Sequence, residues 1–223
     1  MKTCPKYLIT KQRKRIIMKN AQQLFVISAP SGAGKTTLVK SLINRNSKIK
    51  YSISYTTRAP RTNEVHGRDY FFINNEEFNR LKSNNEFIEH AKVFDNYYAT
   101  SKKQIEAIFN NGCNAILEID WQGAMQVRKS IPTCTSIFIM PPSKAALHER
   151  LTNRGTDTKV TIKQRINESE EDMSHWGEFN YCIINDDLEL ASKELELIFS
   201  SSSKLNCTKN PKLIKKINKI LCS

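Results

Sequence analysis

The sequence lacks the features that mark membrane-spanning, secreted and metal-binding chains. No apolar run approaches the ~20 residues that a membrane-spanning helix needs. The six cysteines form no C-x-x-C pair, and no histidine stands at metal-ligand spacing from them. Charged residues interrupt the N-terminal segment, which argues against a secretory signal. We therefore expect a cytoplasmic chain with no membrane partner, whose Cys113, Cys134 and Cys182 are reduced thiols in or beside buried strands.

Acidic residues are missing from both ends of the chain. Residues 1–20 carry seven Lys or Arg and residues 201–223 carry six Lys, with no acid in either segment. Residues 21–200 hold equal numbers of basic and acidic groups, so the two ends account for the net charge of +13. We interpret them as solvated, frayed ends, with an electrostatic arm for RNA, DNA or anionic lipid as the alternative. Met1 and Met18 are both open as the start residue, and a transit peptide is a weakly supported alternative.

Short apolar runs alternate with helical patterns through the middle of the chain. Strands are predicted at Leu24–Ser28, Asn114–Ile119, Ser136–Met140 and Tyr181–Ile184. Helices are predicted from the turn after the first strand to about Ile43, and at Lys102–Asn110, Gln122–Lys129, Lys144–Leu151, Val160–Trp176 and Leu188–Phe199. This alternation is typical of β-α-β units. We therefore expect one α/β domain with three layers, a parallel sheet between two layers of helices.

Two segments break this alternation. Residues from about Tyr51 to Tyr98 mix short strand-like pieces with one helix near Glu76–Lys82, and we interpret them as a small inserted α+β region. Residues Asn153–Lys159 are polar and lack apolar periodicity, so they predict a loop between two helices that could act as a lid. Arg150 and Arg154 lie four apart beside this loop, on one face if the helix continues, with a solvated basic face as the alternative.

The first predicted strand is followed by Ala29-Pro30-Ser31-Gly32-Ala33-Gly34-Lys35-Thr36, which opens the first helix. The pattern is G-x-x-x-x-G-K-[ST] with alanine in the first place. Small residues let the backbone curl so that its N–H groups point at phosphate oxygens, and the helix N-terminus adds partial positive charge. Lys35 then reaches the β- and γ-phosphates, and the Thr36 hydroxyl ligates Mg²⁺. The motif predicts a nucleoside triphosphate site without naming the reaction.

Two further pairs of charged residues stand at informative spacings. Glu118 and Asp120 lie two apart at the end of an apolar strand, so alternation puts both on one face near the ligand-binding edge of an α/β sheet. Arg58 and Arg61 flank a proline that discourages helix, and paired guanidinium groups on an extended loop suit phosphate recognition. For each pair, a solvated surface position is the alternative.

These motifs lie in blocks that resemble the guanylate kinase family, from about Leu24 to Phe199. The blocks are SAPSGAGKTT (28–37), SYTTRAPRTNEVHGRDYFF (54–72), EFIEHAKVFDNYYATS (86–101), ILEIDWQGA (116–124), IFIMPPS (137–143) and RLTNRGTDT (150–158). The second, third and fourth are specific to this family among phosphate-loop kinases. The resemblance implies an enzyme of purine nucleotide metabolism that moves the γ-phosphoryl group of ATP onto GMP, and onto dGMP, and works as a monomer or homodimer.

The resemblance also implies a division of the chain into parts. We expect a flexible basic extension, a kinase domain and a basic C-terminal tail, at residues 1–20, 21–200 and 201–223. Within the domain, the core, the GMP-binding region and the lid would span 21–50 with 100–200, 51–99 and about 144–176.

Site residues follow from the same resemblance, position by position. The catalytic set would be Lys35, Arg150, Arg154 and Arg165, with ATP on residues 29–36. The GMP phosphate would bind Arg58, Arg61, Tyr70 and Tyr98, and the base would bind Ser54, Glu89 and Thr100. Glu118 and Asp120 would organise the GMP pocket and the water around a Mg²⁺ held by Thr36. The first of these acids is more familiar as Asp in the family, which leaves the contact of Glu118 open.

A carboxylate at Glu89 would explain the choice of guanine. Guanine presents two adjacent donors, N1–H and the 2-amino group, and one carboxylate can accept both. Adenine would turn a lone pair toward the same carboxylate, a costly mismatch. Without the resemblance, Glu89 would be interpreted as a surface charge, and Tyr70 and Tyr98 as half-buried strand aromatics.

Three other functions are compatible with parts of the sequence. A kinase for AMP, UMP or dTMP would share the phosphate-binding loop, although the TTRAPR and FIEH blocks disfavour it. A non-catalytic peptide-binding module of guanylate kinase type would share the fold, although such modules usually have degraded phosphate loops and Gly34, Lys35 and Thr36 are intact here. Weak nucleic-acid binding through the basic ends could accompany catalysis.

Overall fold

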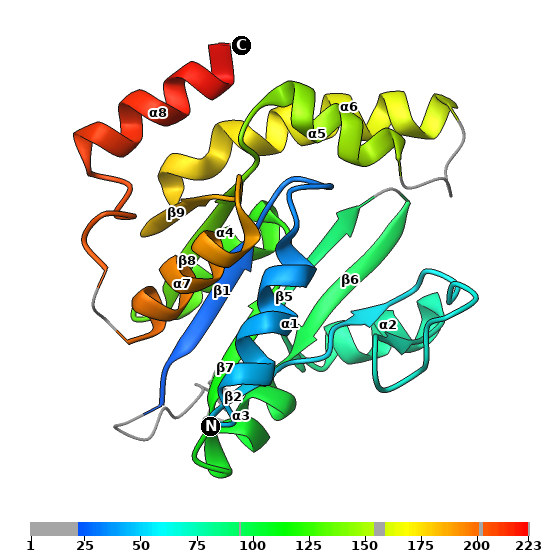
Figure 1. Ribbon diagram of the computed structural model, residues 1–223. Helices are drawn as coiled ribbons and strands as arrows, with labels where there is room; N and C mark the ends of the chain where they lie inside the picture. Colours follow the sequence, from blue (N-terminus) through cyan, green and yellow to red (C-terminus); the bar gives the residue numbers. More distant parts are fainter. Residues whose placement is uncertain (1–21, 94, 154–158, 201–202, 223) are drawn as a thin grey trace, which may run out of the picture.

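A five-stranded parallel sheet forms the centre of the computed structural model, which describes residues 22–93, 95–153, 159–200 and 203–222. The strand order is β2-β7-β1-β8-β9, and neighbouring strands are parallel throughout (Figure 1). The strands are β1 (Leu24–Ser28), β2 (Ile49–Tyr51), β7 (Asn114–Glu118), β8 (Thr135–Met140) and β9 (Tyr181–Ile184). The predicted strands are therefore confirmed, within one residue at each end.

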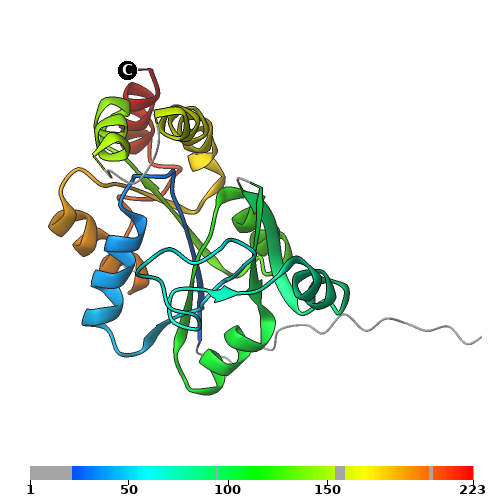
Figure 2. The same cartoon turned by 90° about the vertical axis from the view of Figure 1, so that its right-hand side faces the viewer.

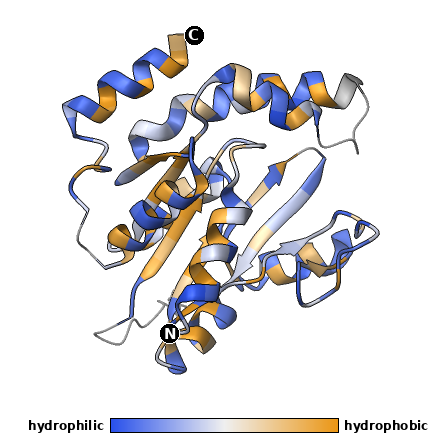
Figure 3. Cartoon of the chain, in the orientation of Figure 1, coloured by the Kyte–Doolittle hydropathy of each residue, from blue (hydrophilic) through white to orange (hydrophobic). Residues whose placement is uncertain are grey.

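Alternation of side chains along β1 explains why helices cover both faces of the sheet. Phe25 and Ile27 belong to one buried apolar cluster, together with residues of two helices, α1 (Lys35–Arg45) and α7 (Leu188–Phe199). Leu24 and Val26 belong to the other, with residues of α3 (Lys102–Asn110), α4 (Trp121–Ser130) and α5 (Lys144–Thr152). The strands at the centre are accordingly apolar along their length (Figure 3). The predicted three-layer α/β fold is confirmed.

A second, four-stranded sheet is built from the segment that breaks the α/β alternation. Its strand order is β4-β3-β6-β5, with β4 (Phe71–Phe72), β3 (Tyr55–Thr56), β6 (Asn96–Ser101) and β5 (Phe87–Val93). The helix predicted near Glu76–Lys82 is present as α2 (Asn75–Ser83), and Phe78 and Leu81 of this helix are buried. Asn74 caps α2, because its side chain accepts a hydrogen bond from the backbone N–H of Glu77 at 2.8 Å.

Two helices that pack against each other follow β8. They are α5 and α6 (Lys159–Ser174), and a 3₁₀ turn, η1 (His175–Glu178), continues the second. His148 and Lys144 of α5 contact the carboxylate of Glu170 on α6, at 3.0 and 3.5 Å. The predicted helix over Val160–Trp176 thus changes from α to 3₁₀ geometry after Ser174. Residues 154–158, which include the predicted lid residue Arg154, lie outside the described residues.

The C-terminal segment corrects one of our expectations. We expected residues 201–223 to be a solvated, frayed end, yet Pro211–Cys222 form a helix, α8, whose Leu213, Ile217 and Ile220 are buried in the main core. Both ribbon views place α8 beside α5 and α6 (Figures 1 and 2). Before the helix, Asn206 O accepts the N–H of Cys182 at 2.8 Å, so this segment pairs with the edge strand β9. Leu213, Ile217 and Ile220 stand at helical spacing, an apolar pattern that the many lysines of this segment obscured.

The described cysteines carry free thiols, as expected of reduced residues. Cys134 and Cys182 are buried in the core, whereas Cys113, which precedes β7, is half-buried. Burial raises the pKa of the Cys134 thiol to about 11, so it stays protonated and unreactive at neutral pH. No helix in the described part of the chain combines the length and the apolar character needed to cross a membrane.

Candidate active site

The phosphate-binding loop connects β1 to α1 at the carboxyl edge of the central sheet. Gly32 and Gly34 adopt φ values of +89° and +90°, a conformation that glycine adopts without steric cost. Gly34 is the N-cap of α1, no side chain caps this helix end, and the first turn holds no acid. The helix therefore presents uncompensated N–H groups and partial positive charge, as an anion site requires.

Asn185, which follows β9, fixes the shape of this loop. Its Nδ2 donates to the carbonyl of Ala33 at 2.7 Å, and a Cβ on Gly34 would overlap the same Nδ2 atom. Only 5% of Asn185 is exposed, so its amide is committed to these contacts. Sequence reasoning did not single out Asn185, although its place directly after the last core strand was a usable signal.

The two predicted acids lie beside the loop, though not on one strand. Glu118 is the last residue of β7, and Thr36 donates a short hydrogen bond to its carboxylate. Lys35 Nζ donates to the carbonyl of Ile119 at 3.2 Å. Asp120 lies beyond the strand as the N-cap of α4, where it accepts the N–H of Gly123 at 2.6 Å. The strand alternation that we expected to align the acids therefore ends before Asp120, and helix capping sets its position.

Two half-buried carboxyl groups interact electrostatically with Lys35. Burial raises the pKa of Asp120, although the Gly123 hydrogen bond and the Lys35 charge act in the opposite direction. Burial also raises the pKa of Asp172, on α6, to about 6, with the Asp120 charge adding to the effect and Lys35 opposing it. Asp172 was missed by sequence reasoning, because it stands among several acids on a helix with no spacing signal.

A second group of buried polar side chains lies between β5, β6 and α4. Glu89 is only 3% exposed, and its Oε1 accepts a 2.6 Å hydrogen bond from Thr100, which is fully buried. A Cβ on Gly123 would lie 2.6 Å from Glu89 Oε2, so the absence of a side chain there makes room for the carboxylate. Burial raises the pKa of Glu89 to about 8, and the Asp120 charge adds to the effect. Ser54, the residue directly before β3, is also buried.

Aromatic rings and arginines form a third group. The Arg58 guanidinium lies 5.5 Å from the ring centroid of Tyr70, and the rings of Tyr70 and Tyr98 are 6.0 Å apart. Burial raises the pKa of Tyr70 to about 12, and the negative charge of Glu118 adds to this effect. Because Glu118 also accepts a hydrogen bond from Thr36, the aromatic group lies near the phosphate-binding loop. Arg61 is largely solvent-exposed, at 62% of its side chain. The structure thus brings Arg58, Tyr70 and Tyr98 together and leaves Arg61 at the rim.

Two of the three arginines predicted to act from a lid, Arg150 and Arg165, lie within the described residues. Arg150 Nη2 donates to the carbonyl of Asn185 at 3.1 Å, so the residue that shapes the phosphate-binding loop also contacts α5. Arg165 is half-buried on α6. The buried Ser169, also on α6, donates to the carbonyl of Ser31 at 3.3 Å, which joins α6 to the loop. An open pocket of about 500 Å³ lies beside Arg150 and is lined by Pro142, Ala146, Glu149, Arg150, Asn153 and Asp186.

The donor set around the loop suits a magnesium ion bound together with phosphates. Within the described residues, no three His, Cys, Asp or Glu side chains are grouped to hold a metal by themselves. The Thr36 hydroxyl and the carboxylates of Glu118 and Asp120 are hard oxygen donors next to the helix N-terminus. Mg²⁺ characteristically binds one or two such groups and completes its shell with water and substrate phosphates.

Known proteins resemble this chain over most of its length. The model of the guanylate kinase family matches residues 21–202. The guanylate kinase of Pseudomonas fluorescens is 50% identical over 179 residues, which cover 80% of this chain and 87% of that protein. The guanylate kinase of Methylococcus capsulatus is 48% identical over 175 residues, 78% of this chain and 86% of that protein. The crystal structure of guanylate kinase from Anaplasma phagocytophilum superposes with a TM-score of 0.68 at 32% identity, covering 91% of this chain and 96% of that one.

Proposed function

This chain belongs to the guanylate kinase family, and from that premise we infer that it transfers the γ-phosphoryl group of ATP to GMP, giving ADP and GDP. One observation supports this activity most directly. Lys35 Nζ donates to the carbonyl of Ile119, the residue before Asp120, and a Cβ on Gly123 would lie 3.3 Å from Asp120 Oδ1 and 2.6 Å from Glu89 Oε2. Asp120 therefore lies between Lys35 and Glu89, which supports placing the triphosphate beside the base. An adjoining triphosphate site and guanine site are what direct transfer requires.

We assign ATP to the loop from Ala29 to Thr36 and to the adjacent open pocket beside Arg150. The backbone N–H groups of the loop would bind the phosphates, and Lys35 would turn from Ile119 toward the β- and γ-phosphates. Thr36 and, through water, Asp120 would hold Mg²⁺. The bound ion would neutralise charge on the transferring phosphoryl group. The buried hydrogen bond from Asn185 Nδ2 to the carbonyl of Ala33 would keep the loop in its binding shape while substrates exchange.

GMP is assigned to the region around Glu89 and Arg58, next to the four-stranded sheet. Glu89 would accept N1–H and the 2-amino group of guanine, with Thr100 and Ser54 as supporting hydroxyls. Arg58, Arg61, Tyr70 and Tyr98 would bind its phosphate, as a second set of donors. None of the described residues assigned above is needed to bind the ribose 2′-hydroxyl. We therefore propose dGMP as a second acceptor.

Transfer itself needs positioning and charge stabilisation rather than a side-chain base. An anionic oxygen of the GMP phosphate attacks the γ-phosphorus, the bond to the β-phosphate oxygen breaks, and ADP leaves. Lys35 and the lid arginines Arg150, Arg154 and Arg165 would offset the charge on the group in transfer. Closure of the lid over both nucleotides would exclude water and limit ATP hydrolysis. The proposed lid boundaries, about 144–176, enclose α5 and α6.

The activity is tested by ADP release with Mg-ATP and each monophosphate in turn. We expect a strong preference for GMP and dGMP over AMP, UMP and dTMP. Lys35→Ala removes the positive charge that would stabilise the phosphoryl group in transfer. We therefore expect kcat with GMP to fall roughly 100-fold or more while the fold is retained. Circular dichroism of the variant is the control for folding.

Two outcomes would contradict the proposal in different ways. Activity on AMP exceeding that on GMP would reassign the base pocket to another nucleotide. A correctly folded wild type without any GMP-dependent ADP release would favour a peptide-binding module. Oligomeric state and a cytoplasmic location are part of the same proposal, and size-exclusion chromatography with light scattering decides between monomer and homodimer.

A further inference from the structure

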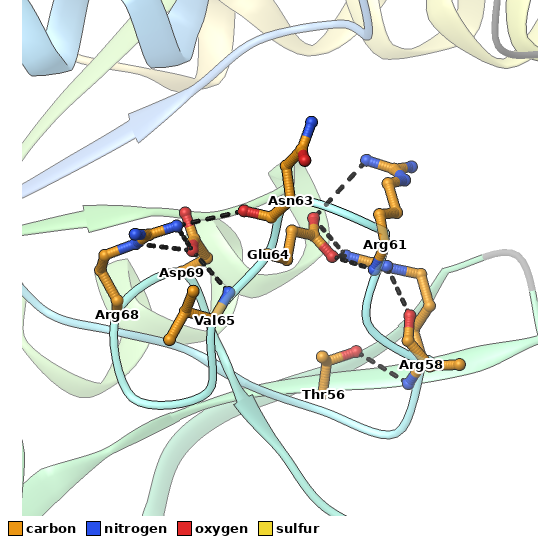
Figure 4. A network of polar contacts seen from close by, with 9 residues as sticks. Thr56, Arg58, Arg61, Asn63, Glu64, Val65, Arg68 and Asp69 are labelled. Carbon is orange, nitrogen blue, oxygen red and sulfur yellow. Dashed lines mark hydrogen bonds and ion pairs between the residues drawn. The ribbon is translucent and has the colours of Figure 1, made fainter.

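A carboxylate stands between the two arginines assigned to the GMP phosphate. Both oxygens of Glu64 accept hydrogen bonds from Arg58 Nη2, at 2.8 and 2.9 Å. Its Oε2 also accepts the backbone N–H of Arg61 at 2.8 Å, and Oε1 lies 3.8 Å from Arg61 Nη1 (Figure 4). Only 16% of the Glu64 side chain is exposed, so this is a built contact rather than a chance pairing of surface charges.

The charge balance of the loop explains what this carboxylate does. Two guanidinium groups three residues apart repel each other, and the repulsion opposes their convergence on one phosphate. Partial burial works against ionisation of Glu64, but the hydrogen bonds from the Arg61 N–H and from Arg58 hold its pKa below its usual value. Glu64 therefore stays ionised at neutral pH, and its charge stabilises the two arginines side by side.

The contacts of Glu64 leave room for a phosphate on the same arginine. A guanidinium has five N–H groups, and Glu64 contacts a single nitrogen of Arg58. A second nitrogen donates to the carbonyl of Ala59 at 2.7 Å, while the rings of Tyr70 and Phe72 lie 5.5 and 5.8 Å from the guanidinium carbon. The plane of Arg58 is thus fixed by groups on several sides, including Tyr98 through a hydrogen bond. We expect a phosphate to bind Arg58 donors other than those directed at Glu64.

We propose that Glu64 is a positioning residue for GMP: it holds Arg58 and Arg61 in their phosphate-binding arrangement before the nucleotide arrives. This inference rests on the proposed function, because it takes the two arginines as ligands of the GMP phosphate. Groups that are already ordered lose little conformational freedom on binding, so the benefit appears in affinity for GMP. Chemistry at the ATP side does not depend on it.

Glu64→Gln tests the inference, because glutamine keeps the size and one acceptor oxygen but turns an NH₂ group toward the donors of Arg58. We expect the Kd and KM for GMP to rise roughly 10-fold to 100-fold, with little change in kcat or in the KM for ATP. Affinity for guanosine, which has no phosphate, should stay at the wild-type value. Glu64→Asp keeps the charge and should lose less GMP affinity than Glu64→Gln.

Asp69→Asn is the matched control, since Asp69 plays the same structural part in the same loop. It accepts the Val65 N–H at 2.8 Å and Arg68 Nε at 3.0 Å, away from Arg58 and Arg61 (Figure 4). We expect Asp69→Asn to leave GMP affinity near the wild-type value. Equal losses in Glu64→Gln and Asp69→Asn would reduce Glu64 to a loop-folding residue.

Three results would overturn the inference. Unchanged GMP binding by Glu64→Gln would show that the carboxylate does not position the arginines, and tighter binding would show that it competes with the phosphate. Guanosine binding weakened as much as GMP binding would point to a general loop defect. If Glu64→Gln does not fold, equal losses of GMP and guanosine affinity in Glu64→Asp would also point to a loop defect. A wild type that binds GMP but does not phosphorylate it would contradict the proposed function. The comparison of GMP affinity between the wild type and Glu64→Gln would still be valid.

Discussion

Glu89, in its proposed role as the acceptor for guanine, would couple recognition to protonation. Burial raises its pKa to about 8, so at pH 7 most of the free protein carries the neutral acid. In the proposed complex the guanine donors require the ionised form, so GMP binding at neutral pH should release a proton. The same shift has a consequence for folding: the stabilising contribution of this group is present at acidic pH and is lost as the pH rises through about 8.

GMP binding should become tighter as the pH rises. Between pH 7 and pH 9 the ionised fraction of a group with a pKa near 8 rises from about a tenth to nine tenths, so the Kd for GMP should fall roughly tenfold. Calorimetry in two buffers with different ionisation enthalpies counts the proton released. Glu89→Gln should bind GMP weakly and with no pH dependence in this range. A wild-type Kd that is flat from pH 7 to pH 9 would contradict the assignment of Glu89 to the base.

At the scale of elements, the first turn of α4 is placed by two carboxylates at once. Asp120 caps it, and the bare Cα of Gly123 lets the Glu89 carboxylate lie against it. Glycine inside a helix ordinarily costs about 1 kcal/mol relative to alanine, so its presence here has to be offset by the room it leaves for Glu89.

Gly123→Ala therefore separates helix stability from recognition. The added Cβ would lie 2.6 Å from Glu89 Oε2, at the movable end of a side chain, so the fold should survive while Glu89 shifts. We expect an unfolding temperature near that of the wild type and a Kd for GMP weakened roughly 10-fold to 100-fold. Gly177→Ala is the control, because a Cβ at Gly177 meets nothing within 4 Å. Equal GMP affinity in both variants would show that Gly123 has no part in the pocket.

The same element shows how far sequence reasoning reached. The strand β7 and the helix α4 were predicted within a residue, because burial on both faces and helical spacing leave a clear local signal. The strand ends at Glu118, one residue earlier than predicted, and Asp120 is a helix cap rather than a neighbour of Glu118 on one strand face. Asn185 was missed although its place directly after the last core strand was a signal, because its partner Ala33 lies far away in the sequence. Glu64 was missed because it acts within a turn, where no periodic pattern encodes its contacts.

For the whole molecule, the C-terminal segment changes the interpretation of charge. Its lysines looked like a solvated tail, but α8 lies on the core with its apolar face inward, beyond the residues 21–202 that match the family. The segment before it covers the edge strand β9. A hypothesis of nucleic-acid binding through this end must therefore place the ligand on the outer face of a folded helix, and any truncation designed to test it also removes part of the core.

A point substitution measures how much of the stability resides in that helix. Ile217 is fully buried among core residues, so Ile217→Ala should lower the free energy of unfolding by about 2–5 kcal/mol. Lys216→Ala, on the exposed side of the same helix, should change it by no more than about 0.5 kcal/mol. Urea unfolding followed by circular dichroism gives both values. If the two substitutions cost the same, α8 is held only loosely and its lysines belong to a dispensable extension; if they differ as expected, the helix is an integral part of the folded domain.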